Sequence, residues 1–249
     1  MNSPLLRARN ISASGQPGGV DIDIARGEIV AITGPSSALS FRTLRALAGV
    51  DADFSGDLEI NGIDLHLLDE TRWLQLRRET GLVSARVPLL STMSAILNVM
   101  LPLNYHHPEA AAFARDRSEA LLEELGFDGN ADALPSELDG TQRFTLQLAR
   151  ELILDPLLLF IEEPFSMHAV ADWAALAQRL VALAQDRNMA LVIGTANLSF
   201  VQQHAARCLF VNEDIMELLA TDDMLAGFGS PESRQFLATV TTWPREPAQ

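Results

Sequence analysis

One stretch of the sequence decides the fold: Gly34-Pro35-Ser36-Ser37-Ala38-Leu39-Ser40-Phe41-Arg42. The apolar residues 27–33 before it predict a buried strand, and residues 43–49 after it predict a helix that ends at Gly49. A strand, a turn that begins with glycine and a helix, in this order, form the frame of a phosphate-binding loop. In such a loop, backbone N–H groups hold the phosphates, a lysine reaches the terminal phosphates, and a Ser or Thr hydroxyl binds Mg²⁺.

The frame is present, but the side chains that grip a phosphate are missing. Gly34 matches the pattern G-x-x-x-x-G-K-[ST], whereas Leu39 stands at its second glycine. Ser40 replaces the lysine, which removes a charge-assisted contact of about 1.5–3 kcal/mol. Phe41 replaces the Mg²⁺ ligand and offers no oxygen. We therefore expect only a vestigial nucleotide site, formed by Gly34, Ser36, Ser37, Ser40 and Arg42.

Two arginines lie on the predicted helix that follows the loop. Arg42 and Arg45 would substitute for the missing lysine if their side chains turned toward the phosphates. Long basic side chains on a helix usually cover apolar surface and keep their charge in water. We interpret both arginines as ordinary helix-surface residues.

The composition indicates a folded α/β protein. The chain has 249 residues, 48% of them hydrophobic, which suits one large domain or a domain with an inserted subdomain. Its formal charge of −15 repels nucleic acid, so we expect no nucleic-acid partner. A single cysteine, Cys208, excludes an internal disulfide framework and a cysteine zinc cluster. No signal-peptide pattern or apolar run of about 18–20 residues is visible, so we expect a cytoplasmic protein that meets the membrane only through a partner.

Strand and helix patterns alternate along the chain, which predicts an α/β fold with a mainly parallel sheet. Further strands are predicted at residues 4–12, 19–24, 56–62, 81–84, 157–161, 190–195 and 208–211. Further helices are predicted at residues 73–79, 93–99 (closed by Pro102), 108–125, 142–154, 171–187 and 200–206. Asn61-Gly62 signals a hairpin turn, and residues 231–249 read as a polar, frayed end.

The landmarks of one family occur in order along the sequence. Residues 34–49 fit a Walker A loop and its helix, 136–143 fit a signature LSGGQ and its helix, and 158–164 fit a Walker B strand. With these landmarks the chain resembles the nucleotide-binding domains of ABC transporters over essentially its whole length. The resemblance implies a P-loop NTPase-like (RecA-like) core with a mainly parallel sheet, an N-terminal antiparallel β part and an inserted α-helical subdomain. It places the core at 1–86 and 140–225, the helical subdomain at 87–139, and a C-terminal tail at 226–249.

The resemblance also implies that most residues of the family's chemistry are replaced. Glu162 stands at the Mg²⁺-associated aspartate, and Glu163 stands at the glutamate that polarises the attacking water. Both are vestigial catalytic candidates, with a solvated acidic turn as the alternative. The Q-loop glutamine falls on Ala85, the D-loop aspartate on Ala169 and the switch histidine on Ala196. Alanine neither orients a water nor relays a proton.

The signature is degenerate at Asp139, Gly140 and Gln142. In the family this segment closes over the nucleotide of the opposite subunit, with a serine that faces the γ-phosphate. Asp139 replaces that serine, and a carboxylate beside a phosphate costs on the order of 1 kcal/mol or more. Asp139 is also a good cap for a helix that begins near Gly140.

The remaining polar candidates indicate no metal site. His106-His107-Pro108-Glu109 reads as a solvated loop at a helix start, because a third ligand is missing. His168 and His204 have no visible carboxylate or nucleophile partner. Cys208 falls in a predicted core strand and is interpreted as a small buried hydrophobe.

The favoured hypothesis is a non-hydrolysing subunit that serves as a docking and dimerisation scaffold. The resemblance implies a groove that accepts a cytoplasmic helix of an ABC permease, and a second ATP-binding-type subunit as partner. The predicted docking residues are Val87, Leu89, Leu90, Met93 and Leu97. The protein would then lie at the inner face of the cell membrane through its permease. Residues 98–103 and 233–237 are also similar to the branch that serves lipid-trafficking, Mce-associated transporters.

Two alternatives remain open at this point. One is an active transporter subunit with atypical or asymmetric ATP hydrolysis. The other is a nucleotide-sensing regulator, in which N–H groups at the start of the helix hold ATP weakly, with or without Mg²⁺.

Overall fold

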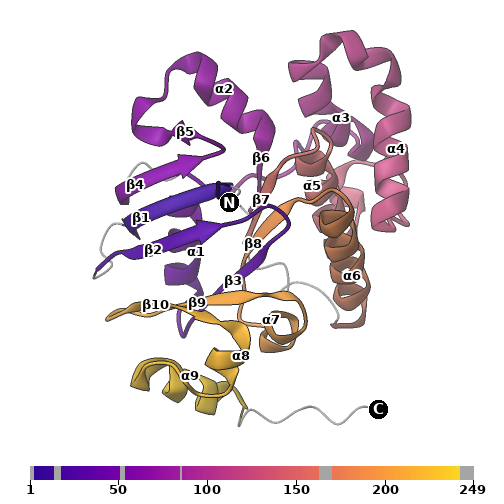
Figure 1. Ribbon diagram of the computed structural model, residues 1–249. Coiled ribbons are helices and arrows are strands. Elements are labelled where there is room, and N and C mark those ends of the chain that lie inside the picture. The colour runs from indigo at the N-terminus through magenta and orange to yellow at the C-terminus, as the bar shows by residue number, and fades with distance from the viewer. Residues whose placement is uncertain (1–2, 14–17, 51–53, 85, 163–169, 242–249) are drawn as a thin grey trace.

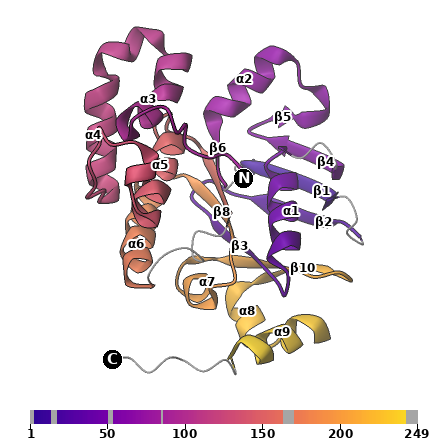
Figure 2. The ribbon, with the colours of Figure 1, turned by 180° about the vertical axis from the view of Figure 1, so that it is seen from behind.

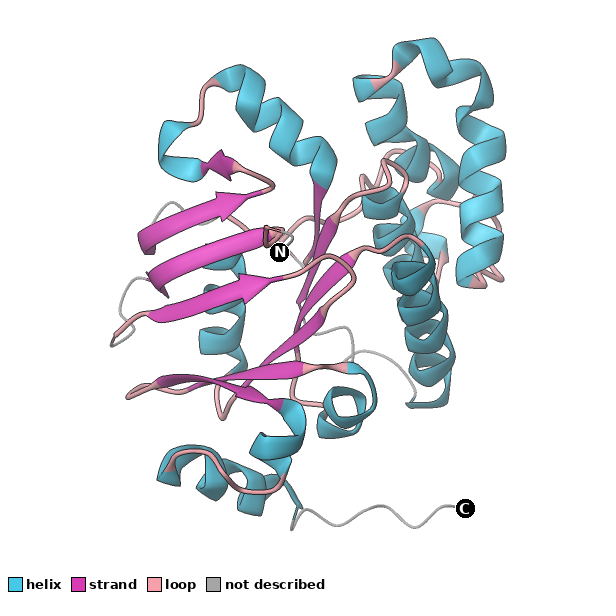
Figure 3. Cartoon of the chain, in the orientation of Figure 1, coloured by secondary structure: helices cyan, strands magenta, loops and turns pink. Residues whose placement is uncertain are grey.

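The computed structural model describes residues 3–13, 18–50, 54–84, 86–162 and 170–241. Two sheets and the helices around them form the molecule (Figures 1 and 3). The strands are β1 (Leu6–Ala13), β2 (Val20–Ile24), β3 (Ile29–Thr33), β4 (Phe54–Ile60), β5 (Ile63–Asp64), β6 (Thr80–Val83), β7 (Leu158–Glu162), β8 (Ala190–Gly194), β9 (Arg207–Val211) and β10 (Met216–Ala220). The α-helices are α1 (Ser37–Leu47), α2 (Glu70–Glu79), α3 (Ala95–His106), α4 (Ala114–Leu125), α5 (Gly140–Leu152), α6 (Val170–Asp186), α7 (Leu198–His204), α8 (Thr221–Leu225) and α9 (Pro231–Thr241).

The sheets confirm the predicted fold class. The N-terminal sheet is antiparallel, in the order β2-β1-β4-β5. The second sheet has the order β10-β9-β3-β8-β7-β6, in which β9 to β6 are parallel and β10 is an antiparallel edge strand. Parallel strands are reached through crossover connections, which explains the alternation of strand and helix patterns in the sequence.

Both faces of the parallel sheet are buried, as its continuous apolar strands require. On β3, Val30 and Ile32 point into a core cluster shared with α1 and the antiparallel sheet, whereas Ile29 and Ala31 point into a cluster shared with α5 and α6. α1 therefore lies between the two sheets (Figure 2), and its residues Leu44 and Leu47 are fully buried there. This sandwiched position of α1 decides the environment of every polar side chain on it.

The turn between β4 and β5 agrees with the sequence. Asn61 and Gly62 both have positive φ, 48° and 78°, and the flanking strands pair with Ile60 opposite Ile63. These dihedrals belong to the turn type that Asn-Gly favours in two-residue hairpins.

The helices between β6 and β7 differ in detail from the prediction. α3 begins only at Ala95, after a segment without helix, and continues to His106 with Pro102 inside it, so the predicted stop at Pro102 is wrong. The first part of the predicted helix 108–125 is a 3₁₀-helix, Pro108–Phe113, and α4 follows it. Gly126 ends α4 in the left-handed conformation, as a helix stop requires. Figure 1 shows α3 and α4 at the opposite end of the molecule from the antiparallel sheet.

The last described segment is more ordered than the sequence suggested. β10, α8 and α9 follow β9, and α9 occupies 231–241 within the range predicted as a polar tail. Phe236 and Leu237 of α9 pack against the core cluster, and the rings of Phe236 and Phe210 lie 5.6 Å apart. These apolar contacts supply the burial that a frayed end lacks. Among the described residues, no helix is long and apolar enough to cross a membrane.

Candidate functional site

The loop after β3 is built around a close backbone contact. A Cβ atom on Gly34 would lie 1.9 Å from the carbonyl oxygen of Val211 at the end of β9, so only glycine fits there. α1 then begins at Ser37, with Ser36 as an extended N-cap whose side chain makes no capping bond. Packing between the loop and the sheet therefore explains Gly34 without a phosphate.

The side chains at the family's lysine and metal-ligand positions are directed into the protein. Ser40 is 2% exposed, and its hydroxyl donates to the Ser36 carbonyl oxygen at 3.3 Å. The ring of Phe41 packs against Gly194 of β8, where an added Cβ would lie 3.0 Å from it. Leu39 packs against the cluster between the sheets. Ser37 is exposed and Arg42 is half-buried on α1.

Arg45 is the cation of this region, and it points inward. Its guanidinium donates to Oε1 of Glu162 at 2.7 Å, and both side chains are only 7% exposed. The prediction that Arg45 is a helix-surface residue is therefore wrong. Because α1 lies between two sheets, its inner face has no access to water, and the acid at the end of β7 supplies the counter-charge.

A hydroxyl holds the second oxygen of the same carboxylate. Ser84, which follows β6, is 2% exposed and donates from Oγ to Oε2 of Glu162 at 2.5 Å. The neighbouring strands β6 and β7 run in register, with Val83 opposite Ile161, so their carboxyl ends bring Ser84 beside Glu162. Both carboxylate oxygens at the expected Mg²⁺ position thus have protein partners, one of them a permanent cation.

Several predicted positions cannot be placed. Ala85, Glu163, His168 and Ala169 lie outside the described residues. In the part of the chain that the structure describes, no three His, Cys, Asp or Glu side chains gather closely enough to hold a metal ion. Ala196 is exposed, and the adjacent Asn197 caps α7.

The degenerate signature forms a helix cap. Asp139 Oδ1 accepts from the backbone N–H of Gln142 at 2.8 Å, and the Gln142 side chain accepts from the Asp139 N–H at 3.1 Å. Gln142 Nε2 also donates to Asp128 at 3.0 Å. Gly140 is the first residue of α5. The capping function that the sequence suggested for Asp139 is confirmed.

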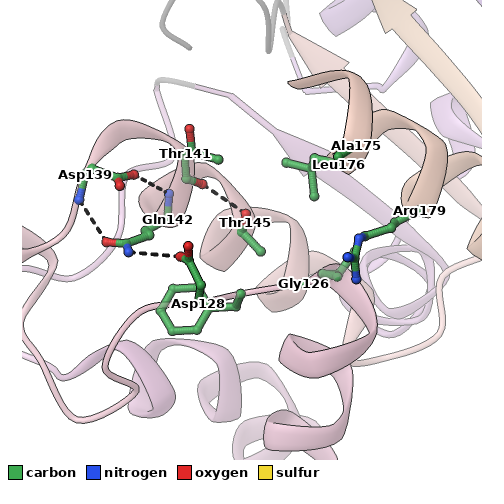
Figure 4. Close-up of a pocket in the computed structure, with 11 residues that line it drawn as sticks. Gly126, Asp128, Asp139, Thr141, Gln142, Thr145, Ala175, Leu176 and Arg179 are labelled. Carbon is green, nitrogen blue, oxygen red and sulfur yellow. Dashed lines mark hydrogen bonds between the residues drawn. The ribbon is translucent and has the colours of Figure 1, made fainter. Parts of the chain in front are cut away.

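These capping residues form one wall of a pocket of about 200 Å³ (Figure 4). The opposite wall carries Gly126 and Arg179. The Arg179 guanidinium lies against Gly126, where an added Cβ would be 2.6 Å from its central carbon. The pocket has acidic groups near the start of α5 on one side and one arginine of α6 on the other. In a signature motif, N–H groups at this helix start would face a phosphate, whereas here the Gln142 N–H donates to Asp139.

The predicted docking residues lie between β6 and the middle of α3, and they differ in exposure. Val87, Leu90 and Leu97 are 40%, 44% and 45% exposed. Leu89 packs against the core and Met93 is half-buried. The five residues therefore form a partly anchored apolar surface with three outward members.

Two buried polar side chains, one on α5 and one on α3, form hydrogen bonds with the backbone of this segment. Arg150 of α5 is 7% exposed and donates to the carbonyl oxygens of Val87 and Pro88 at 2.7 and 2.9 Å. Asn98 of α3 is fully buried; its amide accepts from the Leu90 N–H at 2.7 Å and donates to the carbonyl oxygens of Leu90, Met93 and Ser94 at 3.1 Å each.

The other singled-out side chains have local explanations. His107 pairs with Glu109 at 3.1 Å in an exposed position. Burial lowers the pKa of His106 and of His204, so both favour the neutral form. Cys208 is fully buried, as predicted, and burial raises the pKa of its thiol to about 12. A thiol with such a pKa is inert near neutral pH.

Sequence reasoning missed the residues that organise the site: Arg45, Ser84, Asn98 and Arg150. One signal was available, because the chain contains no lysine and all 18 of its basic residues are arginines. Arginine is the residue best suited to buried ion pairs and to multiple hydrogen bonds with backbone oxygens. To predict that these side chains are buried, one would also have to know partners that are distant in the sequence, such as Glu162 for Arg45.

Comparisons with known proteins give the family. A family model described as ABC transporter matches residues 18–166. The chain is 34% identical over 191 residues to the uncharacterized ABC transporter ATP-binding protein YbbA of Escherichia coli K12, covering 76% of this chain and 82% of that protein. It is 29% identical over 223 residues to methionine import ATP-binding protein MetN 2 of Paraburkholderia xenovorans, covering 90% of this chain but only 57% of that protein.

Solved structures agree on the fold. A dimeric post-hydrolysis state of the ATP-binding cassette MJ0796, bound to ADP and Pi, superimposes with a TM-score of 0.78 at 21% identity. The match covers 87% of this chain and 98% of that one.

Proposed function

The chain belongs to the ABC transporter family, and we propose that it is a non-hydrolysing ATP-binding-type subunit that serves as a docking and dimerisation scaffold for a membrane permease. The observation that supports this proposal is the buried pair of Arg45 and Glu162. The acidic group that would serve a metal is already neutralised by a cation of the chain itself.

A metal would have to compete with that pair for the carboxylate. Removing one partner of a buried ion pair typically costs about 3–5 kcal/mol, because the other charge is left uncompensated. Mg²⁺ at Glu162 would displace Arg45 into a region enclosed by two sheets. Nothing in the loop repays this cost, because Ser40 bonds to Ser36 and Phe41 carries no oxygen ligand.

The same logic applies to a dimer with a second ATP-binding-type subunit. In a family dimer, each nucleotide lies between the Walker A loop of one subunit and the signature of the other. One of the two sites would then contain this chain's Ser40 and Phe41, and the other would contain its Asp139 in place of a serine. Both composite sites would be impaired, so we infer that dimerisation here does not depend on hydrolysis.

The exposed apolar residues supply the docking side of the proposal. Val87, Leu90 and Leu97 are directed to solvent beside a rigidly held backbone, a surface suited to an apolar helix of a permease. The likeness of residues 98–103 and 233–237 to the Mce-associated branch makes lipid the first cargo to test. The name of the MetN relative makes methionine the comparison cargo.

An ATPase assay of the purified chain tests the catalytic half of the proposal. We expect no phosphate release above buffer with millimolar ATP and Mg²⁺, while an intact cassette from another transporter, assayed in parallel, turns over. Mg²⁺-dependent release that disappears in Glu163→Gln would contradict the proposal.

Co-purification with the permease encoded beside this chain tests the scaffold half. Leu90→Asp places a charge in the apolar surface, and we expect it to weaken association at least about tenfold. Leu67→Asp is the matched control, because Leu67 is also an exposed leucine but lies outside the segment that carries the docking residues. Equal association of both variants with the permease would exclude the proposed surface.

A further inference from the structure

We propose that residues 86–94, here called the docking loop, are held in one conformation from the vestigial nucleotide site through Ser84, so that no bound nucleotide is needed to set the position of the docking surface. This inference rests on the proposed function for the identity of the partner, but the network that carries it is independent of that identity. Ser84 and Arg150 are its positioning residues.

Ser84 connects the two regions because its hydroxyl makes two hydrogen bonds. It donates to Glu162 Oε2 at 2.5 Å and accepts from the backbone N–H of Arg86 at 3.1 Å. The Ser84 carbonyl oxygen also accepts from the Val87 N–H at 3.0 Å. A hydroxyl that donates along one direction and accepts along another is oriented by both partners.

The far end of this chain of contacts is fixed to α1. Glu162 Oε1 is held by Arg45, so a turn of the carboxylate would leave either the buried guanidinium or the buried Ser84 hydroxyl without its acceptor. The order of contacts is therefore α1, β7, the end of β6 and then the docking loop. In this order a guanidinium occupies the place where a nucleotide and its metal would act on the carboxylate.

Two further clamps hold the rest of the docking loop. The Arg150 guanidinium binds the carbonyl oxygens of Val87 and Pro88, and its Nε lies 3.4 Å from Glu151, which in turn accepts from the Leu82 N–H on β6. Asn98 binds both backbone groups of Leu90. Backbone groups along the loop are thus satisfied from β6, α5 and α3, while Val87 and Leu90 remain outside.

Hydrogen exchange of the full chain, measured by mass spectrometry, tests this inference. In Ser84→Ala we expect the amide of Arg86, which loses its acceptor, to exchange about fivefold faster or more, as for the loss of one hydrogen bond. The Val87 amide keeps the Ser84 carbonyl oxygen as its acceptor and serves as an internal reference. Ser84→Thr keeps the hydroxyl and should restore the slow exchange. Millimolar ATP with Mg²⁺ should leave exchange across residues 86–94 unchanged.

The decisive variant lies outside the loop. Arg45→Met combined with Glu162→Leu replaces the buried pair by apolar side chains, a change that buried pairs often tolerate. Because Glu162 reaches the loop only through Ser84 among the contacts described above, this double variant should accelerate the Arg86 amide, since the Ser84 hydroxyl remains but loses the partner that orients it. Adding Ser84→Ala to it should raise the exchange rate of Arg86 only to that of Ser84→Ala alone, since both changes act on one connection.

Ser118→Ala is the matched control, because the buried Ser118 hydroxyl has no hydrogen-bond partner among the residues that the structure describes. It should leave exchange in the loop as in the original chain. Unchanged exchange at Arg86 in Ser84→Ala, or protection of the loop on addition of Mg²⁺ and ATP, would overturn the inference. Phosphate release in the separate ATPase assay would instead contradict the proposed function, so the two failures are distinguishable.

Discussion

The vestigial nucleotide region and the docking loop differ in which groups they bury and which they expose. Around α1, charged and polar side chains are buried and bound to one another: Arg45 to Glu162, Glu162 to Ser84, and Ser40 to Ser36. In the docking loop, the buried polar groups of Arg150 and Asn98 bind the backbone, and the apolar side chains of Val87 and Leu90 face solvent. The first region is chemically closed, and the second is open to a partner.

This difference separates loss of chemistry from loss of structure. A site that had only lost selection would be expected to leave unpaired polar groups or cavities, which cost stability. Here Ser40, at the lysine position, and Glu162, at the metal position, are bonded within the chain, and the residues bonded to Glu162 extend to the loop that we propose binds the permease. Among the described residues of this region, the Thr33 hydroxyl at the end of β3 is the buried group that stays unpaired.

The largest effect should follow removal of the internal cation. Arg45→Ala leaves Glu162 buried without its counter-charge, and we expect the free energy of unfolding in urea to fall by about 3–5 kcal/mol. The Arg45→Met, Glu162→Leu double variant should recover most of that loss, to within about 1 kcal/mol of the original chain. A cost below about 0.5 kcal/mol for Arg45→Ala would mean that the pair is solvated and the region is not closed.

On the docking side, the buried amide of Asn98 should matter almost as much. Asn98→Ala removes its four hydrogen bonds and leaves the Leu90 N–H without its acceptor, so we expect a loss of about 2–3 kcal/mol in the same unfolding measurement. Asn104→Ala, on the same helix, is the control, because the buried Oδ1 of Asn104 has no hydrogen-bond partner within the described part of the chain. If both variants lose equal stability, Asn98 has no special part in holding the loop.

A smaller effect is expected at the signature, where a phosphate contact has become a helix cap. Asp139→Ala should destabilise the chain by about 1 kcal/mol, since the Gln142 N–H loses its acceptor. Asp139→Ser restores the residue type of the family and should cost only a few tenths of a kcal/mol, because serine caps helices about as well. Thermal unfolding monitored by circular dichroism distinguishes the two, and an equal loss in both would show that the carboxylate has another role.

The smallest expected effect is none at all. Ser40→Lys restores the missing lysine, yet we expect no phosphate release with ATP and Mg²⁺, because Arg45 still occupies Glu162 and Phe41 still fills the metal-ligand position. The triple variant Ser40→Lys, Phe41→Ser, Arg45→Leu is the comparison in the same assay, because it also removes the Phe41 ring and the guanidinium bound to Glu162. Hydrolysis by Ser40→Lys alone would show that the region is one substitution away from activity and not closed.

The sequence was sufficient wherever the signal was local. Asn61-Gly62 predicted the β4–β5 turn because the turn itself demands those residue types. The burial of β3 followed from the apolar run of its residues. The cap at Asp139 was also predictable, since the residues that make it are three positions apart.

The sequence was insufficient where the deciding partner is distant. Arg45 was predicted to be a surface residue because no residue close to it in the sequence indicated its partner Glu162, which lies 117 positions later. The end of α3 was misplaced because Pro102 usually stops a helix, but packing of Val99 and Leu103 on the core outweighs the hydrogen bond that Pro102 forgoes. Exposure of Val87 and Leu90 likewise depends on anchors in α5 and α3.

The exclusive use of arginine has a consequence for alkaline solution. A guanidinium stays charged to beyond about pH 12, so raising the pH does not remove the positive member of any ion pair that arginine makes here. The Cys208 thiol behaves differently, because its pKa is raised from 9.0 to about 12 in the folded chain. Between these two values the unfolded chain releases a proton that the folded chain retains, so the free energy of unfolding falls as the pH rises through that window. Alkali should therefore destabilise the folded chain through Cys208 on β9, the parallel strand next to the edge strand β10, while the Arg45–Glu162 pair remains charged.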